Sequence, residues 1–137
     1  TLIERRDVVV PMLMNLRQLG ARVAGDDFGP GYSSLAYLHE LPLDVLKIDK
    51  SFVKDVNQDA RGSSLFSAII AMSNSLGLDV VAEGIESYEQ IRELLVRGCD
   101  RGQGYIFTSA CSEAGMALLL DNNGFFAIIE AAQAENA

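Results

Sequence analysis

The sequence predicts an α/β domain built from parallel β/α units. Two observations predict this fold class: short apolar segments that suit buried strands alternate with amphipathic segments long enough for helices, and the alternation occurs four times. Helices placed between buried strands imply parallel neighbours joined by right-handed crossovers. Four such units form either an open sheet or one half of an eight-stranded barrel, and the pattern alone leaves both arrangements open.

The first half of the sequence predicts two strands and three helical segments. Apolar residues at helical spacing predict a helix from Asp7 to Leu19, with Asp7 as its cap and Gly20 at its end. Pro11 is tolerated only near the first turn of a helix, which favours a start later than Asp7. The other expected elements are a buried strand at 21–28, a short helix at 32–38, a buried strand at 44–49 and a helical turn at 52–56.

The second half continues the alternation. Ser87 is expected to cap a helix that runs to Val96, and Gln90 completes a capping box with it. The other expected elements are a helix at 61–76, a strand at 78–83, a weaker strand at 100–106, a helix at 112–120 and a helical tail at 125–134.

The composition is that of a globular protein with an acidic surface. The 137 residues carry a formal net charge of −8, and the absence of clustered Lys and Arg argues against binding of DNA or RNA polymers. Binding of a small anionic ligand remains possible if a metal ion supplies the attraction.

The cysteines and the hydropathy bear on the cellular compartment. Cys99 and Cys111 form no CxxC pair, so we expect free thiols in a reducing compartment. No run approaches the ~18–20 apolar residues of a membrane span, and no signal peptide opens the sequence. We therefore expect a cytoplasmic chain, within a parent protein that is either free or tethered to a membrane.

Polar side chains follow each of the expected strands. In parallel β/α folds, ligands bind beyond the carboxyl ends of the strands, where these side chains would meet. Strand ends also exit into solvent, so a charge at any single end needs no functional explanation. The residues in question are Asp26, Asp27, Lys47, Asp49, Glu83, Glu86 and Gln103.

The adjacent carboxylates of Asp26 and Asp27 indicate a metal site. They repel each other, and a bound cation removes that cost. A turn at Gly29 is expected to let both side chains reach the same rim. Oxygen ligands select Mg²⁺, Mn²⁺ or Ca²⁺, and the single histidine excludes a His-rich zinc site. Lys47 lies in an apolar strand, so we expect an ion pair with Asp26 or Glu83.

Four ordered blocks of the sequence resemble the motifs of a known family. Residues 26–35 resemble the signature DDFGTGYSSL, and residues 41–53 resemble LPVDVLKIDRSFV. Residues 80–86 resemble VVAEGVE, and residues 98–107 resemble GCDxxQGYxF. Over about residues 7–120 the sequence thus resembles, in order and spacing, the EAL domains of bacterial cyclic di-GMP phosphodiesterases.

The resemblance implies the C-terminal half of a TIM-like (β/α)8 barrel that hydrolyses cyclic di-GMP to linear pGpG with two Mg²⁺ or Mn²⁺ ions. It implies that Asp26 and Asp27 bind the metal ions and that Lys47 contacts the metal-bound water. Glu83 would act as a ligand or general base, and Gln103 would support the water. The resemblance also implies support of the substrate or the neighbouring loops by Asp49, Glu86 and Gly104, and dimer contacts by Tyr32, Ser33 and Leu35.

The sequence also departs from the family pattern. It contains neither the Glu-Ala-Leu tripeptide nor the Asn and ELTE glutamates that the family places upstream of the paired aspartates. Pro30 replaces the usual Thr, and Ser109 and Ala110 stand where the family often has Arg-Pro. We expect residues 1–120 to be the C-terminal part of an EAL domain, and residues 121–137 to be a helical tail.

Two readings of function follow from these departures. In the first, the parent domain is an active phosphodiesterase and this chain alone is incomplete and inactive. In the second, the domain is a degenerate, non-catalytic module that binds cyclic di-GMP or a signalling partner. In either reading we expect a homodimer or association with the missing half of the barrel, and a cyclase or sensory domain in the parent stays possible.

Overall fold

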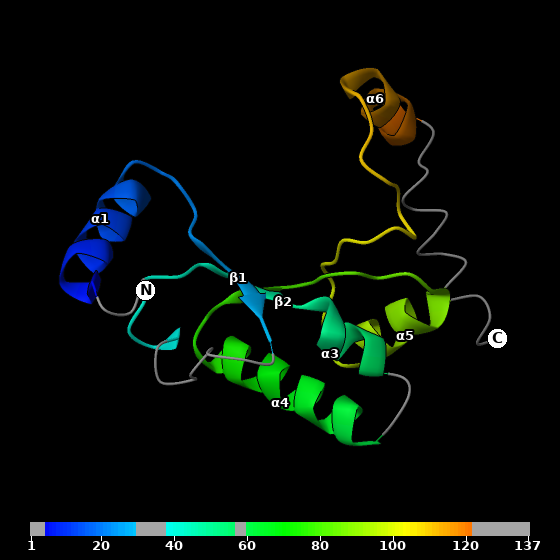
Figure 1. The fold of residues 1–137 in the computed structure, drawn as a ribbon, viewed down its shortest axis with the longest axis horizontal. Coiled ribbons are helices and arrows are strands. Elements are labelled where there is room, and N and C mark those ends of the chain that lie inside the picture. Colours follow the sequence, from blue (N-terminus) through cyan, green and yellow to red (C-terminus); the bar gives the residue numbers. More distant parts are fainter. Residues whose placement is uncertain (1–4, 30–37, 57–59, 122–137) are drawn as a thin grey trace.

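The computed structural model describes residues 5–29, 38–56 and 60–121. The chain folds as a small parallel sheet connected by helices (Figure 1). In chain order the elements are α1 (Arg6–Gln18), β1 (Ala24–Phe28), β2 (Val45–Ile48), α3 (Lys50–Asp55), α4 (Ala60–Ser75), β3 (Asp79–Ala82), α5 (Tyr88–Val96) and α6 (Glu113–Asp121).

The sheet confirms three of the expected strands and their parallel pairing. Its order is β1-β2-β3, so consecutive strands are neighbours, each reached after a crossover. Val45 of β2 pairs with Ala24 of β1 on one side and with Asp79 of β3 on the other. Parallel pairing in sequence order aligns the carboxyl ends of all three strands at one rim, as the β/α pattern predicts.

The core lies between one face of the sheet and helices α3, α4 and α5. Alternate strand residues such as Leu46 and Val80 are buried, together with Phe66 of α4 and Leu94 of α5. Figure 1 shows α3, α4 and α5 on the same side of the strands, whereas α1 and α6 stand apart at opposite ends of the chain. Neither α1 nor α6 contains a buried residue, so the core is formed by the strands and by helices α3, α4 and α5.

The strand expected at 100–106 is not formed. Gly102 makes an isolated parallel bridge with Ala82, and Gln103 donates its backbone N–H to the Ala82 oxygen at 2.9 Å. The segment then leaves the sheet, because the N–H of Phe107 closes a turn onto the oxygen of Gly104 at 3.1 Å. Residues 101–103 therefore occupy the fourth position of the sheet without extending into a strand.

The expected start of the first helix is also wrong. The helix begins at Arg6 with Arg5 as its N-cap and no side-chain cap, so Asp7 lies in the first turn rather than at the cap. A carboxylate in the first turn interacts favourably with the helix dipole, which suits Asp7 there. Pro11 lies inside the helix and costs it one backbone hydrogen bond.

The helix caps of the second half agree better with the sequence. Ser87 and Gln90 form the expected capping box of α5, with the Ser87 oxygen accepting from the Gln90 N–H at 3.2 Å. The helix expected at 52–56 begins earlier, at Lys50, because Asp49 caps it. The helix expected at 125–134 lies outside the described residues. The helix expected at 32–38 does too, except for its last residue. Among the described helices, none has the length and hydropathy that crossing a membrane requires.

Candidate functional site

Asp26 and Asp27 lie at the carboxyl end of β1, where the strand is irregular. The register of β1 against β2 shifts between Gly25 and Phe28. Asp27 has φ +53°, in the left-handed region that Asp tolerates better than most residues. Its backbone N–H donates to Oδ1 of Asp26 at 3.1 Å. This irregularity at Asp27 accompanies the meeting of the two adjacent carboxylates at one rim, and the loop that follows Gly29 lies outside the described residues.

Lys47 joins the ends of all three strands. Its ammonium donates to Oδ1 of Asp26 at 2.8 Å and forms an ion pair with Oε1 of Glu83. The sequence predicted one of these partners, and the structure contains both. The hydrogen bond to Asp26 and that to Glu83 raise the pKa of Lys47, which keeps it charged. The hydrogen bond from Lys47 in turn lowers the pKa of Asp26.

Glu83 follows β3 and is held from two directions. Besides the Lys47 ion pair, its Oε1 accepts a hydrogen bond from Nε2 of Gln103 at 2.7 Å. Its backbone N–H donates to the Ile48 oxygen at 3.0 Å, which fixes the chain at the end of β2. Only 13% of the Glu83 side chain is exposed, so it is better protected from solvent than Asp26 and Asp27, which are both exposed.

The carboxylates of Asp26, Asp27 and Glu83 form a compact cluster. Each offers an oxygen, and these oxygens all lie within 4.8 Å of one another. Carboxylate oxygens are the ligands that Mg²⁺ and Mn²⁺ prefer, so the donor set fits a hard divalent cation. Acidic groups also gather on protein surfaces without a cation, and what sets this cluster apart is the half-buried Lys47 among them.

The three residues expected to give support have distinct places. Asp49 caps α3, since its Oδ1 accepts from the N–H and the hydroxyl of Ser51, and these bonds lower its pKa. Glu86 is exposed, and its backbone N–H donates to Oε1 of Gln90 at 2.8 Å. A Cβ at Gly104 would lie 2.0 Å from the Ile85 oxygen, so only glycine allows this close approach.

A pocket of about 360 Å³ adjoins the cluster. Gln103 belongs to both, because the residue that holds Glu83 also lines this pocket. The pocket combines a cation, a carboxylate and an exposed aromatic ring, which are groups that a polar planar ligand could contact. Its lining residues are Lys50, Gly84, Glu86, Gln103, Gly104, Tyr105 and Thr108. The sequence did not predict Lys50, Tyr105 and Thr108 as site residues, because none of them belongs to the polar groups that directly follow the expected strands.

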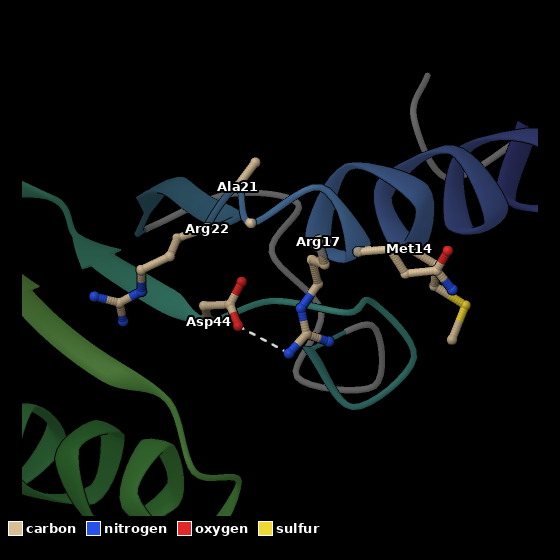
Figure 2. A pocket seen from close by; sticks show the side chains of 7 residues that line it. Met14, Arg17, Ala21, Arg22 and Asp44 are labelled. Atoms are coloured by element: carbon tan, nitrogen blue, oxygen red, sulfur yellow. Dashed lines mark hydrogen bonds and ion pairs between the residues drawn. The ribbon is translucent and has the colours of Figure 1, made fainter.

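Ion pairs connect the amino ends of the strands, at the end of the sheet opposite the acidic cluster. Arg17 of α1 pairs with Asp44 before β2 at 2.8 Å. Figure 2 shows this contact beside a pocket that Arg22 also lines. Arg22 and Arg101 both pair with Asp79 at the start of β3. These contacts connect the amino ends of the strands, away from the acidic cluster. Sequence reasoning missed them, since the pairs are far apart along the chain.

The parallel sheet and its acidic rim place the chain among parallel α/β domains whose strand ends carry a carboxylate cluster that fits a divalent cation. The family model described as EAL domain matches residues 1–110. The chain therefore belongs to the EAL domain family.

Relatives and solved structures agree with this assignment. The chain is 49% identical over 102 residues to the cyclic di-GMP phosphodiesterase NbdA of Pseudomonas aeruginosa, covering 74% of this chain and 13% of NbdA. The crystal structure of the EAL domain of Mycobacterium smegmatis DcpA superposes with a TM-score of 0.81 at 37% identity, covering 86% of this chain and 53% of that one. The fold is thus the C-terminal half of a TIM-like EAL barrel.

A third comparison concerns metal ions. Klebsiella pneumoniae BlrP1, solved as complexes of cyclic di-GMP with manganese and with calcium, matches with a TM-score of 0.74 at 33% identity. That match covers 80% of this chain and 28% of BlrP1. The chain spans about one eighth of NbdA and about half of the DcpA structure, so the activity of a whole protein is a matter for proposal.

Proposed function

We propose that the complete EAL domain containing this sequence hydrolyses cyclic di-GMP to linear pGpG and uses Mg²⁺ or Mn²⁺. The observation that carries the proposal is the cluster of Asp26, Asp27 and Glu83 oxygens within 4.8 Å, with Lys47 paired to two of the three. The relative NbdA is named a cyclic di-GMP phosphodiesterase, which supports cyclic di-GMP as the substrate. The manganese and calcium complexes of BlrP1 support a divalent cation.

Asp26 and Asp27 are the residues that would hold the cations. Their exposure leaves oxygens free to bind, since the Asp26 side chain is 60% exposed although it also accepts from Lys47. Bound divalent cations would supply Lewis acidity, which activates a water and stabilises charge on the phosphoryl oxygens. The lowered pKa of Asp26 keeps it ionised and able to act as a ligand at neutral pH.

Lys47, Glu83 and Gln103 would perform the remaining tasks around the attacking water. Hydrolysis adds the water oxygen to phosphorus, breaks one P–O3′ bond and leaves a 5′-phosphate and a 3′-hydroxyl. Glu83, as base, would accept a proton of that water, and Gln103 fixes the carboxylate orientation through the 2.7 Å hydrogen bond. The Lys47 ammonium would stabilise negative charge as it develops on the phosphoryl group.

The neighbouring residues would shape the substrate site. We propose that Asp49, Glu86 and Gly104 act on the loops rather than on the reacting atoms. The Asp49 carboxylate is engaged in capping α3, and Gly104 permits the tight contact with Ile85 that places Gln103. Glu86 lines the adjoining pocket, where it could contact the ligand.

We further propose that this chain alone is incomplete and inactive. Residues 1–120 would form the C-terminal part of the domain and residues 121–137 a helical tail. Three carboxylates supply at most part of two metal coordination shells. Association with the missing half of the barrel would complete the site. The dimer contacts expected at Tyr32, Ser33 and Leu35 lie outside the described residues and stay a proposal.

The experiment is turnover of cyclic di-GMP by the complete domain with Mn²⁺, measured as pGpG released. We expect Mn²⁺-dependent pGpG formation, abolished by EDTA and by Glu83→Gln. Absence of turnover from a folded domain that carries the upstream motifs would contradict the proposal.

A second candidate is a non-catalytic module, which Ser109 and Ala110 favour because they replace the usual Arg-Pro. Calorimetry separates it from the first. Binding of cyclic di-GMP without pGpG supports a sensor, and no binding supports a protein-interaction role. Hydrolysis by the 137-residue chain alone would contradict the proposed inactivity.

A further inference from the structure

The backbone of Gln103 is held on both sides by the chain that follows β3. Its N–H donates to the Ala82 oxygen at 2.9 Å, and its oxygen accepts from the N–H of Ile85 at 3.1 Å. Ala82 and Ile85 lie on either side of Glu83, whose Oε1 accepts a hydrogen bond from the Gln103 side chain. The hydrogen bond between these two side chains therefore depends on how the Ile85 segment meets the Gln103 segment.

Ile85 packs against the two glycines that flank Gln103. Its side chain is buried, with only 2% exposed. A Cβ at Gly104 would lie 2.0 Å from the Ile85 oxygen, and a Cβ at Gly102 would lie 2.3 Å from the Ile85 Cδ1. Gly104 thus makes room for the backbone of Ile85, and Gly102 makes room for the end of its side chain.

The fit at Gly102 depends on one methyl group of Ile85. Gly102 does not have a positive φ, so its backbone conformation does not itself require glycine. A Cβ there would lie 3.6 Å from Cγ1 of Ile85, an ordinary van der Waals contact, and 3.3 Å from the Ala82 oxygen, which is tight. The severe overlap is with Cδ1 alone. The signature VVAEGVE has Val in place of Ile85, and Val lacks that atom.

We propose that Ile85 is a positioning residue, whose Cδ1 packs on Gly102 and thereby holds Nε2 of Gln103 against Oε1 of Glu83. The buried Ile85 has little room to move, because protein interiors are closely packed. A movement of Gln103 by about 1 Å would lengthen its 2.7 Å hydrogen bond beyond the usual range. Neither Ile85 nor Gly102 lines the adjoining pocket, so their effect reaches the site through Gln103. The expected effect on turnover rests on the proposed function, whereas the packing does not.

NMR of the complete domain tests the positioning without any need for turnover. The side-chain NH₂ group of Gln103 gives signals in a ¹H–¹⁵N spectrum, and Gln103→Leu identifies them by their loss. We expect Gly102→Ala to move these signals toward those of a glutamine side chain in water, because the new Cβ displaces the segment that carries Gln103. Unchanged signals in a folded Gly102→Ala domain would overturn the proposal, whether or not the domain hydrolyses cyclic di-GMP.

Rescue by a second substitution tests whether the Ile85 methyl group is the cause. Gly102→Ala should lower kcat for pGpG formation about tenfold with KM nearly unchanged, because it disturbs a residue that orients a site carboxylate. Adding Ile85→Val removes Cδ1 and leaves Cγ1 at 3.6 Å from the new Cβ. The double variant should therefore recover kcat to within about threefold of the original domain and recover the original Gln103 signals. A double variant as impaired as Gly102→Ala would overturn the proposal.

Ile91→Val is the matched control for losing one methyl group from the core. Ile91 is also buried, but it lies in α5, where its N–H donates to the Ser87 oxygen instead of to the Gln103 segment. Added to Gly102→Ala, it should restore neither kcat nor the Gln103 signals. Equal recovery with Ile91→Val and Ile85→Val would overturn the proposal, because any loosening of the core would then suffice. If the complete domain forms no pGpG, the proposed function fails, and the Gln103 signals still decide the role of Ile85.

Discussion

The ammonium of Lys47 lies 2.8 Å from Oδ1 of Asp26, and this contact joins the middle strand of the sheet to the edge strand. The same ammonium pairs with Glu83 beyond the third strand. One positive charge thus balances carboxylates from both neighbouring strands. The arrangement explains how acidic groups are tolerated side by side at this rim, and it makes the account testable residue by residue.

Removing the Lys47 charge should destabilise the chain in a metal-dependent way. In Lys47→Met, Glu83 and Asp26 face each other without a counter-charge, so we expect a loss of about 1–2 kcal/mol in the free energy of unfolding. Mn²⁺ should restore more of the melting temperature in this variant than in the original chain, because a cation replaces the lost charge. Thermal unfolding with Mn²⁺ and with EDTA measures both effects. Lys47→Arg, which keeps the charge, is the control, and equal responses to Mn²⁺ in all three proteins would contradict the account.

Two substitutions at Asp27 should change stability by different amounts while changing metal binding equally. Asp27 has φ +53°, so Asp27→Ala places a Cβ in the left-handed region without a polar group to compensate. Asp27→Gly removes that strain and should be about 1 kcal/mol more stable than Asp27→Ala in urea unfolding. Both variants lose the same carboxylate, so both should lose the same share of Mn²⁺ affinity. If the two variants unfold at the same urea concentration, backbone strain at Asp27 does not contribute to the free energy of unfolding.

Gln103 should matter for activity more than for folding. Its side chain is exposed overall but holds Oε1 of Glu83 at 2.7 Å. Gln103→Leu in the complete domain should lower kcat about 10–100-fold, the usual cost of losing a group that orients a metal-site residue. Tyr105→Phe lies in the same pocket, does not touch Glu83 in the described contacts, and serves as the control. The rate of pGpG formation measures both, and an unchanged kcat in Gln103→Leu would show that Glu83 needs no orientation.

Asp44 gives the fold a defined dependence on pH. The N–H of Val23 donates to Asp44 at 2.8 Å, and Arg17 pairs with Asp44 from α1 (Figure 2 shows the Arg17 contact). Both contacts lower the pKa of Asp44. A carboxylate with a lowered folded-state pKa stabilises the fold above its unfolded value and loses that effect as pH falls through the folded value. The melting temperature of Asp44→Asn should therefore lie below that of the original chain at neutral pH. The gap should close below about pH 4. A gap that stays constant down to pH 3 or widens on acidification would contradict this assignment.

Much of this architecture follows from local patterns in the sequence. The apolar runs around Leu46 and Val80 indicated buried parallel strands, and Ser87 with Gln90 indicated the cap of α5, because each depends on neighbours a few residues away. The gathering of Asp26 and Glu83 at one rim followed from parallel topology.

The remaining features depend on contacts that no local pattern contains. The irregularity at Asp27 arises where β1 meets β2, and the weak pairing of Gly102 depends on the turn that follows it. The double pairing of Asp79 with Arg22 and Arg101 connects residues far apart in the sequence. The cap at Asp49 depends on the placement of the Ser51 N–H and hydroxyl around its Oδ1, which the position of the acid at a strand end does not reveal.

Binding of Mn²⁺ to the complete domain, followed by titration calorimetry, tests the central claim that the paired aspartates hold metal. We expect saturable binding that Asp26→Asn and Asp27→Asn each weaken at least about tenfold, while Asp49→Asn, at the cap of α3, leaves it unchanged. Mn²⁺ affinity that is the same in Asp26→Asn, Asp27→Asn and the original domain would contradict the account.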